Sequence, residues 1–166
     1  MGRLDRWRAP RALRLWMIYA TRIGDGWLWY GLAAFLTFFG GAQHWRALIA
    51  CTMAIFTGVV LFSILKQVCR RPRPRFAMLR STDAPAPPDQ FSFPSGHTIT
   101  AFAGAVSLMH LYPEAAPFLL PCAVSIAASR VLLGMHYPSD VIVGAAIGTG
   151  LGYSAYLLMV SFWLRP

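Results

Sequence analysis

Residues 141–164 read VIVGAAIGTGLGYSAYLLMVSFWL, a run of 24 residues without a Lys, Arg, Asp or Glu. A helix of this length and polarity can cross a hydrocarbon core about 30 Å thick. Two more uncharged runs, 26–45 and 47–65, are nearly as long, and two shorter ones lie at 98–113 and 115–129. The polar residues at their ends can lengthen the shorter runs. We therefore predict an all-α polytopic membrane bundle with about five spans, near 28–44, 46–65, 97–112, 116–133 and 139–161.

The composition agrees with this prediction. Hydrophobic residues make up 57% of the 166 residues and charged residues 13%, whereas a soluble domain carries about 25% charged residues. The mean hydropathy is +0.51. These values argue against a free cytosolic enzyme, a disordered chain and a coiled coil. The length fits one domain, so residues 1–166 are predicted to form a single membrane domain.

The few charges are mostly positive. The chain has 15 Lys and Arg against 6 Asp and Glu, a formal net charge of +9, and all the cations except Lys66 are arginines. A chain this apolar has little water-facing surface for nucleic acid, so we expect anionic lipid headgroups and phosphorylated substrates as partners. Three widely spaced cysteines without a Cys-x-x-Cys pair indicate apolar packing rather than disulfides or zinc.

The first 24 residues differ from the rest. Arginines alternate with Trp, Leu, Ile and Tyr, and the apolar stretch at 15–20 is too short to span a bilayer. No small-residue cleavage site follows, which argues against a secretory signal peptide. We predict an interfacial amphipathic helix in 1–24, with a basic tail that only sets the topology as the alternative.

One long loop is expected, at 66–96. Pro72, Pro74 and the run STDAPAPPD at 81–89 prevent a continuous helix there. In any five-span arrangement the second and fourth helices end on the side where the third and fifth begin. The ends marked by Lys66, His97, Arg130 and Asp140 should therefore be neighbours.

Three segments at these ends match a known signature. Lys66 is followed seven residues later by Arg73-Pro74, residues 94–97 read PSGH, and Ser129-Arg130 precedes His136 and Asp140 at fixed spacing. In order and in spacing, these eleven positions resemble the type 2 phosphatidic acid phosphatase (PAP2) superfamily. Members commonly have six spans, and here the first crossing is expected to be replaced by the amphipathic segment.

The residues also suit phosphate chemistry on physical grounds. Phosphoryl transfer spreads negative charge over three oxygens, and Lys66, Arg73 and Arg130 would bring positive charge from three segments. Ser95 would add a hydroxyl donor. Gly96 would let the backbone approach the phosphate at a helix N-terminus, where free N–H groups and the helix dipole favour an anion.

The resemblance gives the histidines separate roles. His136 would be the nucleophile and form a phosphohistidine, with Asp140 accepting a hydrogen bond from one ring nitrogen. His97 would protonate the leaving group and then activate water. No cofactor is expected and no metal site, because the six acids, Asp5, Asp25, Asp83, Asp89, Glu114 and Asp140, are scattered.

Each residue alone has a plainer interpretation. The cations could anchor headgroups, Ser95 could be only a helix cap, and a lone histidine is more often structural. For Asp25 we favour a local ion pair with Arg22 over a substrate contact. His44 and His110 lie towards the opposite face and are assigned no catalysis.

The resemblance implies a metal-independent lipid phosphatase in a bacterial inner membrane. Its candidate substrates are phosphatidate, phosphatidylglycerophosphate, prenyl phosphates or diphosphates, and phosphorylated glycolipids. A phosphotransferase with the same phosphohistidine, or a non-catalytic headgroup binder or transporter, are the alternatives. Outside Lys66, Arg73 and Arg130, ten cations lie on the active face and two on the other, so the positive-inside rule predicts a cytoplasmic site. The sequence does not define an oligomeric state.

Overall fold

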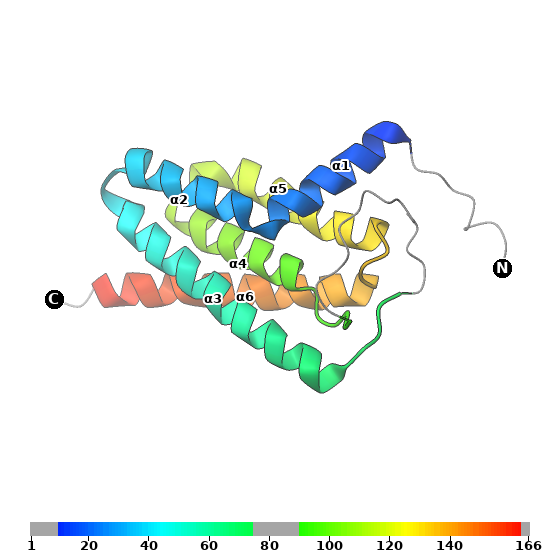
Figure 1. Cartoon of the computed structure of the whole chain (residues 1–166). Coiled ribbons are helices and arrows are strands. Elements are labelled where there is room, and N and C mark those ends of the chain that lie inside the picture. Colours follow the sequence, from blue (N-terminus) through cyan, green and yellow to red (C-terminus); the bar gives the residue numbers. More distant parts are fainter. Residues whose placement is uncertain (1–9, 75–89, 164–166) are drawn as a thin grey trace.

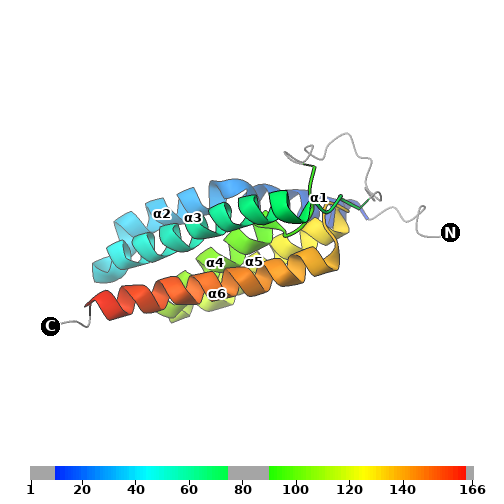
Figure 2. The same cartoon turned by 90° about the horizontal axis from the view of Figure 1, so that it is seen from below.

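The protein is described here by a computed structural model that covers residues 10–74 and 90–163. Within these ranges the regular elements are helices and there is no β-strand, which confirms the predicted all-α class. Figure 1 shows the helices as an elongated bundle, and α4 runs between α3 and α6 in the turned view of Figure 2. The six α-helices are α1 (Arg11–Arg22), α2 (Leu28–Phe39), α3 (His44–Cys69), α4 (Gly96–Leu111), α5 (Ala116–Leu132) and α6 (Pro138–Trp163).

In the part of the chain that the structure describes, three helical segments are long and apolar enough to cross a membrane, at Gly41–Cys69, Pro113–Leu132 and Pro138–Phe162. The helices α2 and α4 have 12 and 16 residues. At 1.5 Å per residue they measure about 18 and 24 Å, less than the thickness of a hydrocarbon core. The expected span at 28–44 corresponds to the shorter helix α2, whereas α4 has the length of the expected span at 97–112 and begins one residue earlier. The count of five spans stays a prediction.

The first two helices are joined by a kinked turn, Ile23–Trp27, rather than by a long loop. Gly26 in this turn has a φ of 116°, a conformation that glycine adopts without strain. Upstream of the turn, α1 packs against α5 and buries Met17, Ala20 and Thr21. The location of α1 at a membrane surface stays a prediction, and residues 1–9 of the expected amphipathic segment lie outside the described residues.

A stripe of glycines seats α6 against α4. A Cβ at Gly148 would lie 2.4 Å from the carbonyl oxygen of Ile99, and a Cβ at Gly152 would lie 2.5 Å from that of Ala103. One turn earlier, a Cβ at Gly144 would lie 3.0 Å from the carbonyl oxygen of Ser95. Small residues at intervals of four are typical of closely packed membrane helices. Only glycine lets these two backbones approach so closely.

The expected loop at 66–96 begins later than predicted. Helix α3 continues through Lys66 to Cys69 and ends at Arg70, whose φ of 45° is left-handed. The two ends of the loop then meet, because the backbone N–H of Ser92 donates to the carbonyl oxygen of Arg71 at 2.8 Å, and Pro72 and Phe91 form an antiparallel bridge. Residues 75–89 of the loop lie outside the described residues.

The four helix ends that carry the signature do lie at one end of the bundle, at the right of Figure 1. There the C-terminal ends of α3 and α5 meet the N-terminal ends of α4 and α6. The backbone N–H of Ser95, just before α4, donates to the carbonyl oxygen of Asp140 in α6 at 3.2 Å. The predicted convergence of these helix ends is confirmed.

Candidate active site

His136 is held between a carbonyl group and a guanidinium. Its Nδ1 lies 2.7 Å from the carbonyl oxygen of Ser92. A carbonyl can only accept, so Nδ1 carries the proton and Nε2 keeps the lone pair. This Nε2 lies 3.4 Å from Nη1 of Arg73. The unprotonated nitrogen of a neutral imidazole therefore faces the Arg73 guanidinium.

The turn before α6 places His136 and keeps it neutral. The backbone N–H groups of Met135 and His136 both donate to the carbonyl oxygen of Arg130 at 3.1 Å. The residue is only 3% exposed. Burial, together with the charges of Arg130 and Arg73, lowers the pKa of His136 to about 3. At neutral pH no deprotonation is needed before the ring can act as a nucleophile.

The prediction that Asp140 accepts a hydrogen bond from His136 is wrong. Its Oδ2 lies 3.6 Å from Nδ1, and Ser92 supplies the acceptor instead. Both oxygens of Asp140 have other partners: Oδ2 accepts the backbone N–H of Tyr137 at 2.9 Å, and Oδ1 accepts Nη1 of Arg71 at 2.8 Å. A carboxylate at the third position of a helix commonly accepts the backbone N–H of the N-cap residue, here Tyr137, and so stabilises the start of the helix. Asp140 therefore holds the first turn of α6 beside the imidazole.

Arg71 is a site residue that no sequence pattern singled out. Its Nη1 also donates to Oγ of Ser139 at 2.8 Å, and its guanidinium lies 4.1 Å from the centre of the Tyr137 ring. The side chain is 39% exposed, while that of Asp140 is fully buried. Arg71 thus compensates a buried carboxylate. No spacing rule distinguishes it from Arg70, which is exposed and donates to the carbonyl oxygen of Gln67.

The three predicted phosphate-binding cations come from three segments, as expected. Lys66 is buried in the last turn of α3, with Nζ 5.2 Å from the centre of the Phe62 ring. Arg130 is buried in the last turn of α5, and its Nη1 lies 3.4 Å from Oγ1 of Thr21 in α1. Lys66 and Arg130 both act electrostatically on His97 and on His136. The same two cations therefore serve both histidines.

The start of α4 supplies donors next to these cations. Ser95 occupies the N-cap position, yet its side chain makes no capping hydrogen bond, and its Oγ accepts Oγ1–H of Thr98 at 2.9 Å. Because Oγ of Ser95 accepts this hydrogen bond, its own hydroxyl proton does not point at Thr98. At the following Gly96, a Cβ would lie 3.1 Å from the Phe62 ring, and its expected role in letting the backbone approach the phosphate stays a prediction. Its small size preserves helix packing near the anion site.

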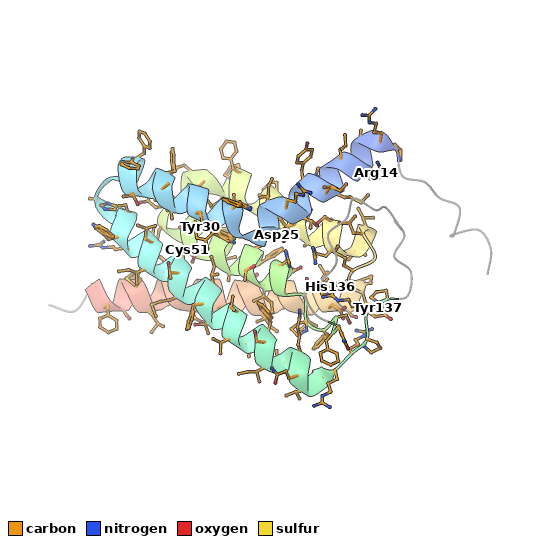
Figure 3. The ribbon with its side chains drawn as sticks, in the orientation of Figure 1. Arg14, Asp25, Tyr30, Cys51, His136 and Tyr137 are labelled. Atoms are coloured by element: carbon orange, nitrogen blue, oxygen red, sulfur yellow. The ribbon has the colours of Figure 1, made fainter. Side chains whose placement is uncertain are left out.

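His97 is paired with Asp25, for which the sequence predicted an ion pair with Arg22. Its Nε2 lies 2.7 Å from Oδ1 of Asp25, which is 72 residues earlier in the chain. The local ion pair that we favoured for Asp25, with Arg22, is replaced by this contact. Figure 3 shows Asp25 at the bend between α1 and α2, next to the start of α4, and His136 at the start of α6.

A cavity of about 270 Å³ begins at this histidine–carboxylate pair. It lies among α2, α3 and α4. Asp25 and His97 form its polar end. Its apolar walls come from Trp29, Ile55, Val59 and Phe62.

Together these features define a helical membrane protein with an anion site built from cations, helix ends and two histidines. A family model described as the PAP2 superfamily matches residues 44–163. The chain belongs to this superfamily.

Curated relatives cover most of the chain. It is 30% identical over 139 residues to an undecaprenyl-diphosphatase of Sulfolobus acidocaldarius, covering 82% of this chain and 66% of that protein. It is 35% identical over 130 residues to a decaprenylphosphoryl-5-phosphoribose phosphatase of Mycobacterium tuberculosis, covering 76% and 68%. A lipid A 1-phosphatase of Rhizobium etli is 34% identical over 108 residues, covering 63% and 46%. The chain thus spans about half to two-thirds of the length of these relatives.

Two solved structures share the fold. LpxE of Aquifex aeolicus superposes with a TM-score of 0.73 at 30% identity, covering 92% of this chain and 89% of that one. A transmembrane PAP2-type phosphatidylglycerolphosphate phosphatase from Bacillus subtilis superposes with a TM-score of 0.75 at 21% identity, covering 95% and 82%. Together with the three apolar helices, these likenesses identify an integral membrane protein.

Proposed function

We propose that this protein is a lipid phosphatase that hydrolyses the phosphomonoester or diphosphate of a membrane lipid through a phosphohistidine on His136. The observation that carries the proposal is the state of that imidazole. Nδ1–H is fixed on the Ser92 carbonyl and Nε2 faces Arg73. A neutral, oriented nucleophile beside a phosphate-binding guanidinium is what phosphoryl transfer requires.

In the first step, Nε2 of His136 attacks phosphorus while Lys66, Arg73 and Arg130 hold the equatorial oxygens. The bond to the leaving oxygen breaks, and its electron pair stays with that oxygen, which takes a proton from His97. In the second step His97 accepts a proton from water as the water oxygen attacks phosphorus. The P–N bond breaks, its electrons return to Nε2, and inorganic phosphate leaves. Both steps use the protein's own side chains.

The cavity supports a lipid as the leaving group. His97 stands at its polar end, and Trp29, Ile55, Val59 and Phe62 give it apolar walls. The leaving oxygen that His97 protonates carries the rest of the substrate, so the first part of the lipid chain would lie in this cavity. The three curated relatives are named for lipid A, undecaprenyl diphosphate and decaprenylphosphoryl-5-phosphoribose, each of which is a lipid that carries phosphate.

The experiment is phosphate release by the purified full-length protein from lipid phosphates in mixed micelles. The panel contains a prenyl phosphate, a prenyl diphosphate, phosphatidate, phosphatidylglycerophosphate and a phosphorylated glycolipid. Release from at least one of them, lost in His136→Gln, supports the proposal. Transfer of the phosphoryl group to an added lipid or sugar alcohol, in place of water, would indicate the phosphotransferase alternative. Binding without turnover of any substrate would contradict enzymatic function.

We further propose that the site faces the cytoplasm in an inner membrane, because the cations concentrate at this end. The exposed Cys69, at the end of α3, is a native probe of this face. In intact cells, Cys69 should resist an impermeant maleimide, and Glu114→Cys at the other end should react in a Cys69→Ser background. The opposite pattern would place the site outside.

A further inference from the structure

A second carboxylate, Asp25, lies at the site outside the three signature segments. It belongs to the turn Ile23–Trp27, where the helical path from α1 to α2 is kinked at Gly26. Here the turn aims the Asp25 carboxylate at the first turn of α4, where its Oδ1 lies 2.7 Å from Nε2 of His97.

The backbone of the same turn is fitted to the imidazole. A Cβ at Gly24 would lie 3.2 Å from Cδ2 of His97 and 2.9 Å from Cγ2 of Ile126. The backbone at Gly24 thus lies close to both the His97 ring and Ile126 of α5, and the ring has one edge on the carboxylate. The second ring nitrogen, Nδ1, points away from the bond to Asp25, because the two nitrogens lie on different edges of the imidazole.

We propose that Asp25 is a positioning residue for His97: it accepts the Nε2–H hydrogen bond and leaves Nδ1 as the atom that exchanges the proton with the leaving oxygen. The proposal rests on the proposed function. When His97 is an imidazolium, Nδ1–H is given to the leaving oxygen and Nε2–H stays on Asp25. The neutral ring then has its lone pair on Nδ1, ready to take a proton from water. The carboxylate also offsets the cations Lys66 and Arg130, which oppose a positive charge on His97.

A purely structural role for Asp25 would predict something different. A carboxylate that only ties the α1–α2 turn to α4 would affect every substrate alike. A carboxylate that supports a general acid matters most when the leaving group is a poor one, since a good leaving group departs without a proton. The leaving group is therefore the variable that separates the two roles.

The test compares two phosphomonoesters, an alkyl phosphate and p-nitrophenyl phosphate, with the full-length protein in detergent. The rate of the first turnover is measured for the unmutated chain and for Asp25→Asn, Asp25→Glu and Glu114→Gln. Glu114 is an exposed acid at the other end of the bundle, so its variant is the matched control. Melting temperatures of all variants are measured in parallel.

Asp25→Asn should lower the first-turnover rate with the alkyl ester about 10- to 100-fold and with the p-nitrophenyl ester less than about threefold. Asp25→Glu should restore part of the alkyl rate, and Glu114→Gln should change neither. Equal losses with both esters, or no loss with either, would overturn the proposal while the unmutated protein remains active. If the unmutated protein cleaves neither ester nor any lipid phosphate, the proposed function fails, and the role of Asp25 with it.

Discussion

The carbonyl oxygen of Ser92 lies 2.7 Å from Nδ1 of His136. A backbone group at the end of the long loop thus decides which nitrogen of a residue 44 positions later carries the proton. The loop end is itself held by the hydrogen bond from Ser92 to Arg71 and by the bridge between Pro72 and Phe91. The orientation of the His136 ring therefore depends on closure of the loop ends.

Arg71→Gln should weaken both stability and activity. The variant removes the guanidinium from the buried carboxylate of Asp140. Because Arg71 is partly exposed, we expect a loss of about 1–3 kcal/mol rather than the full cost of breaking a buried pair. Phosphate release should also fall, since Asp140 holds the turn that carries His136. Thermal melting in detergent and initial rates check both effects. Arg70→Gln is the neighbouring control, and equal behaviour of the two variants would contradict the role of Arg71.

Gly148→Ala should separate α6 from α4. The added methyl would lie 2.4 Å from the carbonyl oxygen of Ile99, and overpacking of this kind costs about 1–3 kcal/mol. The melting temperature and the phosphatase rate should both fall. Gly150→Ala, in the same helix with nothing within 4 Å of its Cβ, should leave both unchanged or slightly raise the melting temperature. A Gly148→Ala protein as stable as Gly150→Ala would show that the close approach of the helices is unimportant.

Stability should depend on pH through His136. Its pKa is about 3 in the folded protein and about 6.5 in an unfolded chain. Between these values the unfolded state binds the extra proton, so stability is complete above about pH 6.5 and falls as the pH is lowered. At pH 5 the loss should be about 2 kcal/mol. His136→Gln cannot take the proton, so its melting temperature should drop less between pH 7 and pH 5. Identical drops in melting temperature in both proteins would contradict the assignment of this pH dependence to His136.

Activity should be unchanged in excess EDTA. The proposed phosphate site is made of Lys66, Arg73 and Arg130, and the charge of the transferring group is balanced by these side chains. Phosphate release is measured before and after prolonged chelation, with the melting temperature as a control for unfolding. Loss of activity that returns with a divalent cation would contradict the metal-independent scheme.

Much of the site could be predicted because the motif residues fall at helix ends. Alternating crossings of a bilayer return the C-terminus of one helix and the N-terminus of the next to the same side. The helix ends marked by Lys66, His97, Arg130 and Asp140 were therefore placed together correctly from the sequence.

The contacts between segments could not be predicted in the same way. The partner of His136 is a backbone carbonyl, which every residue has, so no side-chain pattern marks Ser92. The pairing of Asp25 with His97 depends on the kink at Gly26, and no sequence pattern indicates where that kink directs the Asp25 side chain. The four-residue spacing of Gly144, Gly148 and Gly152 could have indicated the contact between α4 and α6. A search for uncharged runs alone does not detect this spacing.

The most direct measurement of the central claim is chemical trapping of the phosphoryl group. The protein is mixed with a ³²P-labelled lipid phosphate, quenched within the first turnover and digested. The account predicts an alkali-stable, acid-labile label on the peptide that contains His136, absent from His136→Gln. Rapid phosphate release with no labelled histidine, or full activity in His136→Gln, would contradict it.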